Sequence, residues 1–211
     1  FDIISCTVTI DPHPEPFSEP DHRRTSMILT IGEILFDHFP EYRRVGGAPL
    51  NFSWHMKKMG FNVRFITRVG DDAEGKEIKH LLERGSFVEK DLQVDSKHPT
   101  GVVTVTVDSD GVPTFEILPG AAYDNLEMND EVRCLLRDGP ELIYSGTLIQ
   151  RTKTGRRFVE ELVSQPSGPV RFLCDLNLRP GCYVQETIEA SLDRADVLKL
   201  NEEELVVVKD L

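Results

Sequence analysis

From Met27 onward, the sequence alternates short apolar segments with longer segments in which apolar residues recur at helical spacing. The segments predicted to be strands are 27–36, 63–69, 142–145, 170–176 and 197–200, and those predicted to be helices are 50–59, 73–84, 154–163 and 185–194. Strands that alternate with helices are joined by right-handed crossovers, which place them in a parallel sheet with helices on both faces. Residues 27–211 are therefore expected to form a doubly wound, mainly parallel α/β domain.

Residues 101–117 depart from this alternation. Valine and threonine alternate along 101–107, and residues 108–111 have the composition of a turn. The pattern predicts a β-hairpin with one apolar and one mixed face. A hairpin has no place inside a parallel sheet, so we expect it to project from the domain and to cover another surface. The alternative is a surface hairpin without a ligand role.

Residues 1–26 do not fit the pattern of the domain. The chain begins with Phe1, and residues 11–20 contain four prolines among acidic residues, without an apolar period. Such a composition cannot bury enough apolar surface to fold, so these residues are predicted to be an extended or disordered extension. Met27 stands where a native start would be expected.

Composition narrows the classes of function. At 211 residues, of which 39% are hydrophobic, the chain has room for one sizeable core. Its net charge of −12 argues against nucleic acid or an anionic membrane as a partner, so small molecules are expected. No apolar run reaches membrane-spanning length. The cysteines fit neither a disulfide framework nor a zinc site, which favours a reducing, cytoplasmic location; they are Cys6, Cys134, Cys174 and Cys182.

Two adjacent glycines lead directly into a predicted helix. Gly46 and Gly47 carry no side chain that would keep backbone amides away from a ligand, and Pro49 suits the first helical turn because no N–H is needed there. Asn51 would face this turn. Its amide can donate and accept hydrogen bonds together, as a polyhydroxylated ligand requires. An ordinary strand-to-helix connection is the alternative interpretation.

The order and spacing of several sequence blocks resemble the N-terminal two-thirds of the ribokinase-like (PfkB) carbohydrate kinases, and are closest to the fructokinase-like branch. These blocks are GEILFD at 32–37, the residues Gly46, Gly47, Asn51, Ser53, Gly60 and Gly70, and VGDDAEG at 69–75. The resemblance covers residues 27–211. It implies a ribokinase-like fold in which the hairpin at 101–117 is a lid over the sugar and a homodimer contact.

The resemblance also implies an activity. Members of the family transfer the γ-phosphate of ATP to a sugar hydroxyl with the help of Mg²⁺, and K⁺ is expected in the intact enzyme. The substrate-binding residues would be Asp37, Gly46, Gly47, Asn51 and Arg179. Asp37, expected at the end of the first strand, can accept hydrogen bonds from two sugar hydroxyls. A solvated loop carboxylate is the alternative for this residue.

Two further blocks resemble those of the family. Residues 175–179 match a D-x-N-x-R block, in which Asn177 would lie near the phosphates and Arg179 near the substrate. Arg179 would also suit an acidic or phosphorylated substrate, and a strand-end arginine paired with a glutamate is the alternative. Asn201 and Glu204 match an N-x-x-E block, where Glu204 would contact Mg²⁺ through water. The same two residues also fit a helix capping box, which needs no metal.

The family's anion hole and catalytic base lie together in a G-A-G-D block, and no such block occurs before Leu211. We therefore expect that this chain contains no catalytic residue and that the catalytic base lies beyond Leu211. The chain alone would then transfer no phosphoryl group, and the C-terminal part of the fold would be missing. The alternatives are a 2-keto-3-deoxygluconate or nucleoside kinase of the same fold, and a non-catalytic sugar-binding or dimerising module.

Overall fold

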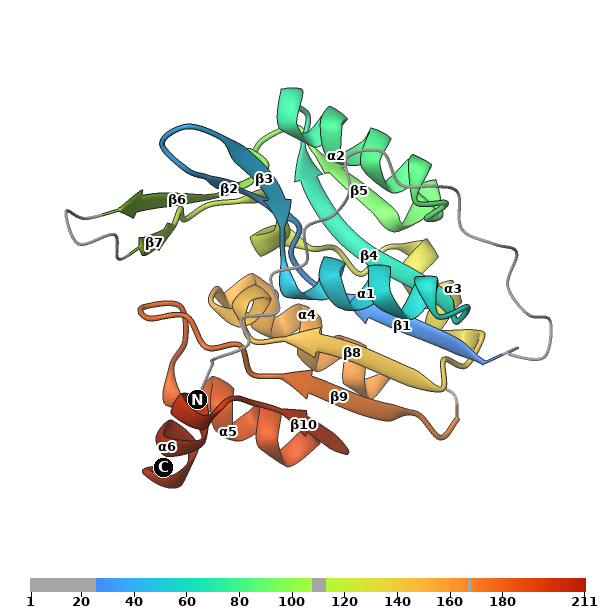
Figure 1. The fold of residues 1–211 in the computed structure, drawn as a ribbon. Helices are drawn as coiled ribbons and strands as arrows, with labels where there is room; N and C mark the ends of the chain where they lie inside the picture. The colour runs from blue at the N-terminus through green and yellow to red at the C-terminus, as the bar shows by residue number, and fades with distance from the viewer. Residues whose placement is uncertain (1–25, 108–112, 167) are drawn as a thin grey trace.

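The computed structural model describes residues 26–107, 113–166 and 168–211 (Figure 1). Its centre is a six-stranded sheet in which all neighbouring strands are parallel. In spatial order the strands are β10 (Val197–Lys199), β9 (Arg171–Asp175), β8 (Leu142–Gly146), β1 (Met27–Ile31), β4 (Asn62–Gly70) and β5 (Leu92–Asp95). The predicted parallel α/β sheet is confirmed.

Helices cover both faces of this sheet. On one face, α1 (Ala48–Lys58) and α2 (Ala73–Arg84) enclose an apolar cluster with β1 and β4, centred on Trp54. On the other face, α3 (Asp130–Arg137) and α4 (Lys153–Ser164) pack over β1 and β8. The remaining helices, α5 (Gln185–Arg194) and α6 (Glu202–Lys209), share a smaller cluster with the end of β9. Burial on two faces explains why apolar residues predominate in β1 and β8.

A second sheet projects from the first, at the left of Figure 1. Its strand order is β3 (Arg43–Gly46), β2 (Leu35–His38), β6 (Gly101–Val107) and β7 (Pro113–Ile117). Strands β6 and β7 pair antiparallel, so the predicted hairpin is confirmed, although its turn at 108–111 lies outside the described residues. We call these four strands the lid sheet. The hairpin is half of this sheet, because β2 pairs with β6 and β3 pairs with β2.

The prediction of a single strand over 27–36 is wrong. β1 ends at Ile31, and the chain leaves the central sheet before β2 begins in the lid sheet. Asp37 therefore lies in β2, and not at the end of the first strand of the central sheet. The apolar run conceals this break because both strands bury apolar side chains. Strand β5 and helix α3 were not predicted, and the expected extension at 1–26 falls almost entirely outside the described residues.

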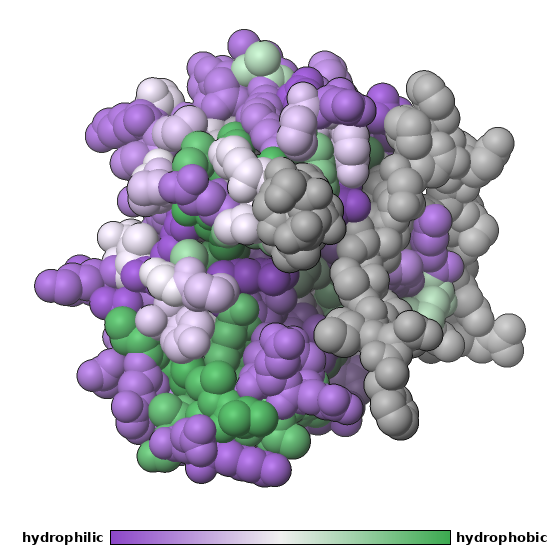
Figure 2. Space-filling model, turned by 60° about the vertical axis from the view of Figure 1, so that its left-hand side comes forward, coloured by the Kyte–Doolittle hydropathy of each residue, from purple (hydrophilic) through white to green (hydrophobic). Residues whose placement is uncertain are grey.

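Exposed apolar side chains are concentrated toward the end of the chain. Figure 2 shows hydrophobic residues on the lower part of the molecule, where Figure 1 places α5, β10 and α6. The exposed residues of this region are Val184, Val197, Leu198, Leu205, Val206 and Leu211. Strand β10 is also an edge of the central sheet. Within the described part of the chain, no helix is both long and apolar enough to cross a membrane.

The junction between α2 and the lid sheet depends on Asp72. Its Oδ1 accepts a hydrogen bond from the Gly75 amide at 2.7 Å, which caps α2. The same carboxylate accepts hydrogen bonds from the backbone amide and the hydroxyl of Thr100, at 2.8 and 2.7 Å. Thr100 immediately precedes β6, so one side chain ties the start of a helix to the base of the lid sheet.

We expect Asp72→Ala to lower the free energy of unfolding by about 2 kcal/mol, because it removes a helix cap and leaves donors at Thr100 unpaired. Urea denaturation monitored by circular dichroism measures this change. Asp71→Ala is the matched control: Asp71 is exposed, its contact to Lys76 is 3.7 Å long, and its loss should cost less than about 0.5 kcal/mol. Equal effects of the two substitutions would contradict the role given to Asp72.

Candidate functional site

Asp37 of β2 and Gly46 of β3 form one wall of the candidate site. A Cβ atom at Gly46 would lie 2.8 Å from Asp37 Oδ2, so a larger residue there would displace this carboxylate. Arg44, opposite Asp37 in the strand ladder, donates a hydrogen bond from Nε at 3.3 Å. Burial raises the pKa of Asp37, and the positive charges of Arg44 and Arg179 oppose this shift. Asp37 is thus a partly buried acceptor at the inner end of the lid sheet.

Gly47 and Asn51 form the adjoining wall. Gly47 has φ 119°, a backbone conformation that glycine adopts without strain, and it precedes the first residue of α1. The Asn51 amide donates to the Gly47 carbonyl at 3.0 Å and closes the first helical turn. Asn51 Oδ1 is buried and has no hydrogen-bond partner among the described residues. A buried amide oxygen without a partner is costly, so this atom is a candidate acceptor for a ligand.

Glu33 lies against the same turn, in the connection between β1 and β2. A Cβ atom at Gly47 would come within 2.6 Å of the Glu33 carbonyl oxygen. The Glu33 side chain accepts a hydrogen bond from the Ala48 amide at the start of α1, while its Oε2 has no partner among the described residues. Only 2% of Glu33 is exposed, and this burial raises the pKa of its carboxyl group to about 7. Backbone hydrogen bonds oppose the shift, and the nearby charge of Asp175 adds to it.

Asp175, at the end of β9, is buried but fully supplied with donors. The Tyr144 hydroxyl donates to its Oδ2 at 2.7 Å, and Lys199 Nζ lies 2.8 and 2.9 Å from its two oxygens. Arg179, four residues further along the chain, is exposed. Its positive charge opposes the burial that raises the pKa of both Glu33 and Asp37.

The residues predicted to handle phosphate lie beside this site. Asn177 has φ 39°, in the loop after β9. Glu204 accepts hydrogen bonds from the amides of Leu178 and Asn201, both at 2.8 Å, and the Glu204 amide donates to Asn201 Oδ1 at 2.8 Å. The capping box foreseen as an alternative is therefore present at α6. It also ties α6 to the loop that carries Asn177. The described residues contain no group of three or more His, Cys, Asp or Glu side chains that could hold a metal.

Charged side chains connect the lid sheet to α2 on its outer side. Glu74 Oε1 of α2 accepts a hydrogen bond from Arg43 Nη1 of β3 at 2.9 Å, and it lies 2.7 Å from His38 Nε2 of β2. Arg43 also contacts Glu77 at 2.6 Å and lies over the ring of Phe36, 4.5 Å from its centroid. The lid sheet is thus held over the carboxyl edge of the central sheet by ion pairs as well as by its strand connections.

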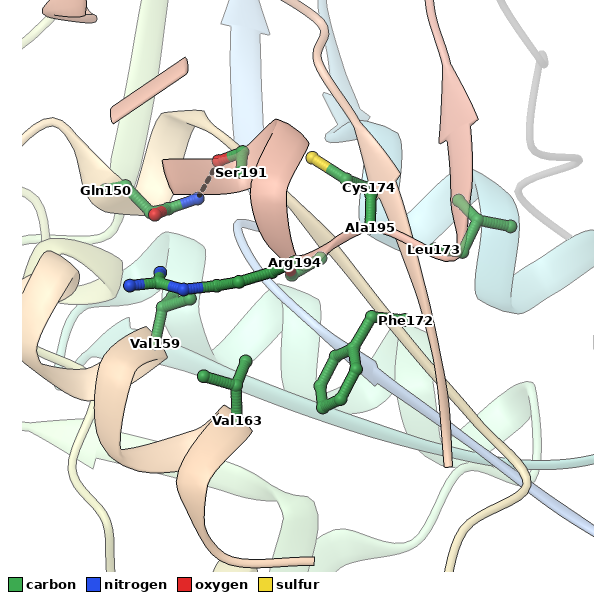
Figure 3. A pocket seen from close by; sticks show the side chains of 10 residues that line it. Gln150, Val159, Val163, Phe172, Leu173, Cys174, Ser191, Arg194 and Ala195 are labelled. Carbon is green, nitrogen blue, oxygen red and sulfur yellow. Dashed lines mark hydrogen bonds between the residues drawn. The ribbon is translucent and has the colours of Figure 1, made fainter. Parts of the chain in front are cut away.

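Two cavities of the structure lie away from this site. One of about 20 Å³, large enough for a single water molecule, lies between α4, α5 and β9 (Figure 3). There Gln150 Nε2 donates to Ser191 Oγ at 3.3 Å. A larger groove of about 260 Å³ lies at the opposite, amino ends of the strands and is lined mainly by apolar residues. Neither includes Asp37, Asn51 or Arg179.

Asp37, Gly46, Gly47 and Asn51 lie around the crossing between the lid sheet and the start of α1, and Arg179 follows β9. Their role in binding a substrate stays a prediction. Sequence reasoning missed the buried acids and tyrosines around them. One signal was available: Glu33 is an acid inside a segment predicted to be a buried strand, and buried charges require a special reason. Tyr144 gave no such signal, because tyrosine is common in strands.

The family model for pfkB carbohydrate kinases matches residues 41–209. This chain belongs to the pfkB family. The pfkB-family chain is 28% identical to a fructokinase of Salmonella typhimurium over 192 residues, which is 86% of this chain and 62% of that protein. It is also 26% identical to a fructokinase of Klebsiella pneumoniae, with the same coverage of both chains. The pfkB-family chain thus spans less than two-thirds of the length of these relatives.

Solved structures show the same fold. One is an uncharacterized sugar kinase of Pyrococcus horikoshii in complex with ATP, on which this pfkB-family chain superposes with a TM-score of 0.77. The two are 24% identical, and the match covers 87% of this chain and 66% of that one. A fructokinase of Vibrio cholerae, in a form with bound fructose, ADP and calcium ion, gives a TM-score of 0.69 at 23% identity, over 86% of this chain and 62% of that one. The prediction of a ribokinase-like fold is confirmed.

The environment of Glu33 predicts a pH-dependent stability. Its folded-state pKa, about 7, lies above the ordinary value of 4.5, so the stability that its protonated form contributes is present below pH 4.5 and is lost as the pH rises through 7. Glu33→Gln cannot ionise. We expect the variant to gain up to about 3 kcal/mol over the wild type between about pH 5 and pH 8. Urea denaturation across this range tests it, and parallel pH profiles for both proteins would contradict it.

Proposed function

We propose that this chain is the sugar-binding part of an ATP-dependent carbohydrate kinase with a fructokinase-like substrate. The observation that carries the proposal is the meeting of Asp37 with the Gly46–Gly47 turn and Asn51 beneath the lid sheet. An ionised carboxylate that accepts, an amide that donates and accepts, and exposed backbone amides together match the hydroxyl groups of a sugar. The fructose-bound Vibrio cholerae relative and the ATP-bound Pyrococcus horikoshii relative support the same assignment.

In such an enzyme, the sugar hydroxyl would attack the γ-phosphate of ATP. The residues described here would bind and orient the sugar at the carboxyl edge of the sheet, where open α/β sheets bind ligands. Arg179 lies on the same edge, and its charge is shared with two carboxyl groups. The catalytic base and the anion hole are proposed to belong to the whole protein.

Mg²⁺ would supply charge neutralisation to the phosphates when bound. The first turn of α6 fits a cation rather than a bare anion, because it carries Glu202, Glu203 and Glu204. Both oxygens of Glu204 already accept hydrogen bonds from backbone amides. We therefore propose that Glu204 contacts Mg²⁺ only through water, with Asn177 and Asn201 on the phosphate side. K⁺ is proposed for the intact enzyme on the family resemblance alone.

Arg179 favours a second substrate class. Its guanidinium group is exposed at the candidate site and can bind a carboxylate with two parallel hydrogen bonds. An acidic sugar such as 2-keto-3-deoxygluconate therefore remains an alternative to fructose. A cytoplasmic location is also part of the proposal, and the free thiols of the described residues support it; they are Cys134, Cys174 and Cys182.

Asp37→Asn and Asn51→Ala should each weaken fructose binding by about 1 to 3 kcal/mol, because each leaves sugar hydroxyls without partners in a shielded site. Isothermal titration calorimetry with fructose, and in parallel with 2-keto-3-deoxygluconate and adenosine, measures the loss and ranks the substrate classes. Asp71→Asn, an exposed acid after β4, is the control and should bind like the wild type. If both site variants keep wild-type affinity for every probe, the sugar site lies elsewhere.

We also propose that the lid sheet forms a homodimer contact. Strand β7 is an edge of that sheet, and Phe115 within it is 51% exposed, which leaves unpaired backbone groups beside an apolar side chain. Phe115→Asp should shift the protein toward monomer in sedimentation velocity, because a charge would be buried in the interface. Val94→Asp, at an equally exposed valine of the outer strand β5, is the control. A wild-type protein that is monomeric at all concentrations would overturn the proposal.

A further inference from the structure

Glu33 has contacts that helix capping alone does not explain. Helix α1 has no acidic residue in its first turn and no side-chain cap from Gly47. Glu33, outside the helix, accepts from the Ala48 amide and so supplies the negative group that favours a helix N-terminus. This contact uses only part of the carboxyl group. Oε2 remains buried without a partner among the described residues. A side chain selected only as a cap would not require this second, costly atom.

The groups around Glu33 come from every element that adjoins the sugar site. Asp175 and Arg179 act directly on its charge. Two tyrosines also interact with the Glu33 charge: Tyr123, in the short 3-10 helix Ala122–Asn125, and Tyr144 of β8. Burial is the main cause that raises the pKa of each hydroxyl group. Tyr144 is committed to Asp175, whereas the buried Tyr123 hydroxyl has no hydrogen-bond partner among the described residues. None of these groups makes a hydrogen bond to Glu33 Oε2.

Ionisation of Glu33 becomes more costly when a ligand covers the site. Its Oε2 is buried and has no partner among the described residues, so ionisation places charge on an unpaired oxygen. The positive charge of Arg179 opposes the rise in the pKa of Glu33, but it also acts on Asp37, which Arg44 already contacts. When Glu33 is protonated, a ligand that covers the site does not seal an unpaired charge beneath it.

We propose that Glu33 is a positioning residue of the sugar site: its carboxyl group fixes the Gly47 turn at the start of α1, and a sugar that covers the site binds best when this buried, partly unpaired carboxyl group is protonated. This inference rests on the proposed sugar-binding function. It goes beyond that function because it couples the binding of a sugar to the uptake of a proton. The residue that takes up the proton, Glu33, need not touch the sugar. The neutral form of Glu33 is the binding-competent form.

The test is calorimetric titration of fructose into the 211-residue chain between about pH 6 and pH 8. Wild-type affinity should fall as the pH rises, by up to about tenfold per pH unit, because binding favours the protonated form. Titrations in two buffers of different ionisation enthalpy should show proton uptake on binding. Glu33→Gln retains an acceptor for the Ala48 amide and cannot ionise. It should bind within about twofold of the wild type at pH 6, with no pH dependence and no proton uptake.

Two further variants separate this role from a structural one. Glu33→Ala, which leaves the Ala48 amide without its acceptor, should bind more weakly at every pH. Glu141→Gln is the matched control, since Glu141 is an exposed glutamate at the amino ends of the strands, and it should keep the wild-type pH profile. A Glu33→Gln protein with the wild-type pH profile, or a wild type whose Asp37-dependent binding is flat with pH, overturns this inference alone. A wild type that binds no fructose at any pH overturns the proposed function together with it.

Discussion

The approach of Gly47 to the Glu33 carbonyl fixes the relation between the two sheets. The chain passes this point twice, once when it leaves β1 for the lid sheet and once when it returns from β3 to start α1. A side chain at Gly47 would separate the two passages and move α1 away from the lid sheet. Asp37 lies in β2 and Asn51 in α1, so a displacement of α1 would also change the distance between these two residues.

Three buried acids near the carboxyl edge illustrate how surroundings assign different tasks to the same chemical group. Asp175 accepts hydrogen bonds from a hydroxyl and an ammonium group, and Glu204 accepts them from two backbone amides. Both carboxylates therefore stabilise the fold. Glu33 accepts hydrogen bonds from backbone amides but keeps one oxygen unpaired, and its burial raises the pKa of the carboxyl group to about 7. Differences in hydrogen-bond supply, more than in burial, distinguish these groups, because all three are less than a tenth exposed.

The repeating elements were accessible from sequence because each has a strong local pattern. The helices predicted at 73–84 and 185–194 agree with α2 and α5 at both ends, and the glycines and Asn51 were found through their spacing. The division between β1 and β2 was not accessible, since an apolar run does not reveal in which sheet each half pairs. Four-residue β5 is too short to show a period. The position of Glu33 beside Asp175 joins residues far apart in the chain, which no local pattern encodes.

The ion pairs that join Glu74 to Arg43 and His38 have a consequence for kinetics. These charged groups are partly exposed, so dissolved salt screens the attraction between the lid sheet and α2. The screening length is about 8 Å at physiological ionic strength. Apolar contacts resist salt. Rates of ligand entry and escape at the candidate site should therefore vary with ionic strength even for an uncharged ligand, while the equilibrium within the closed site varies less. The exchange of ligand would then respond to the salt content of the surroundings.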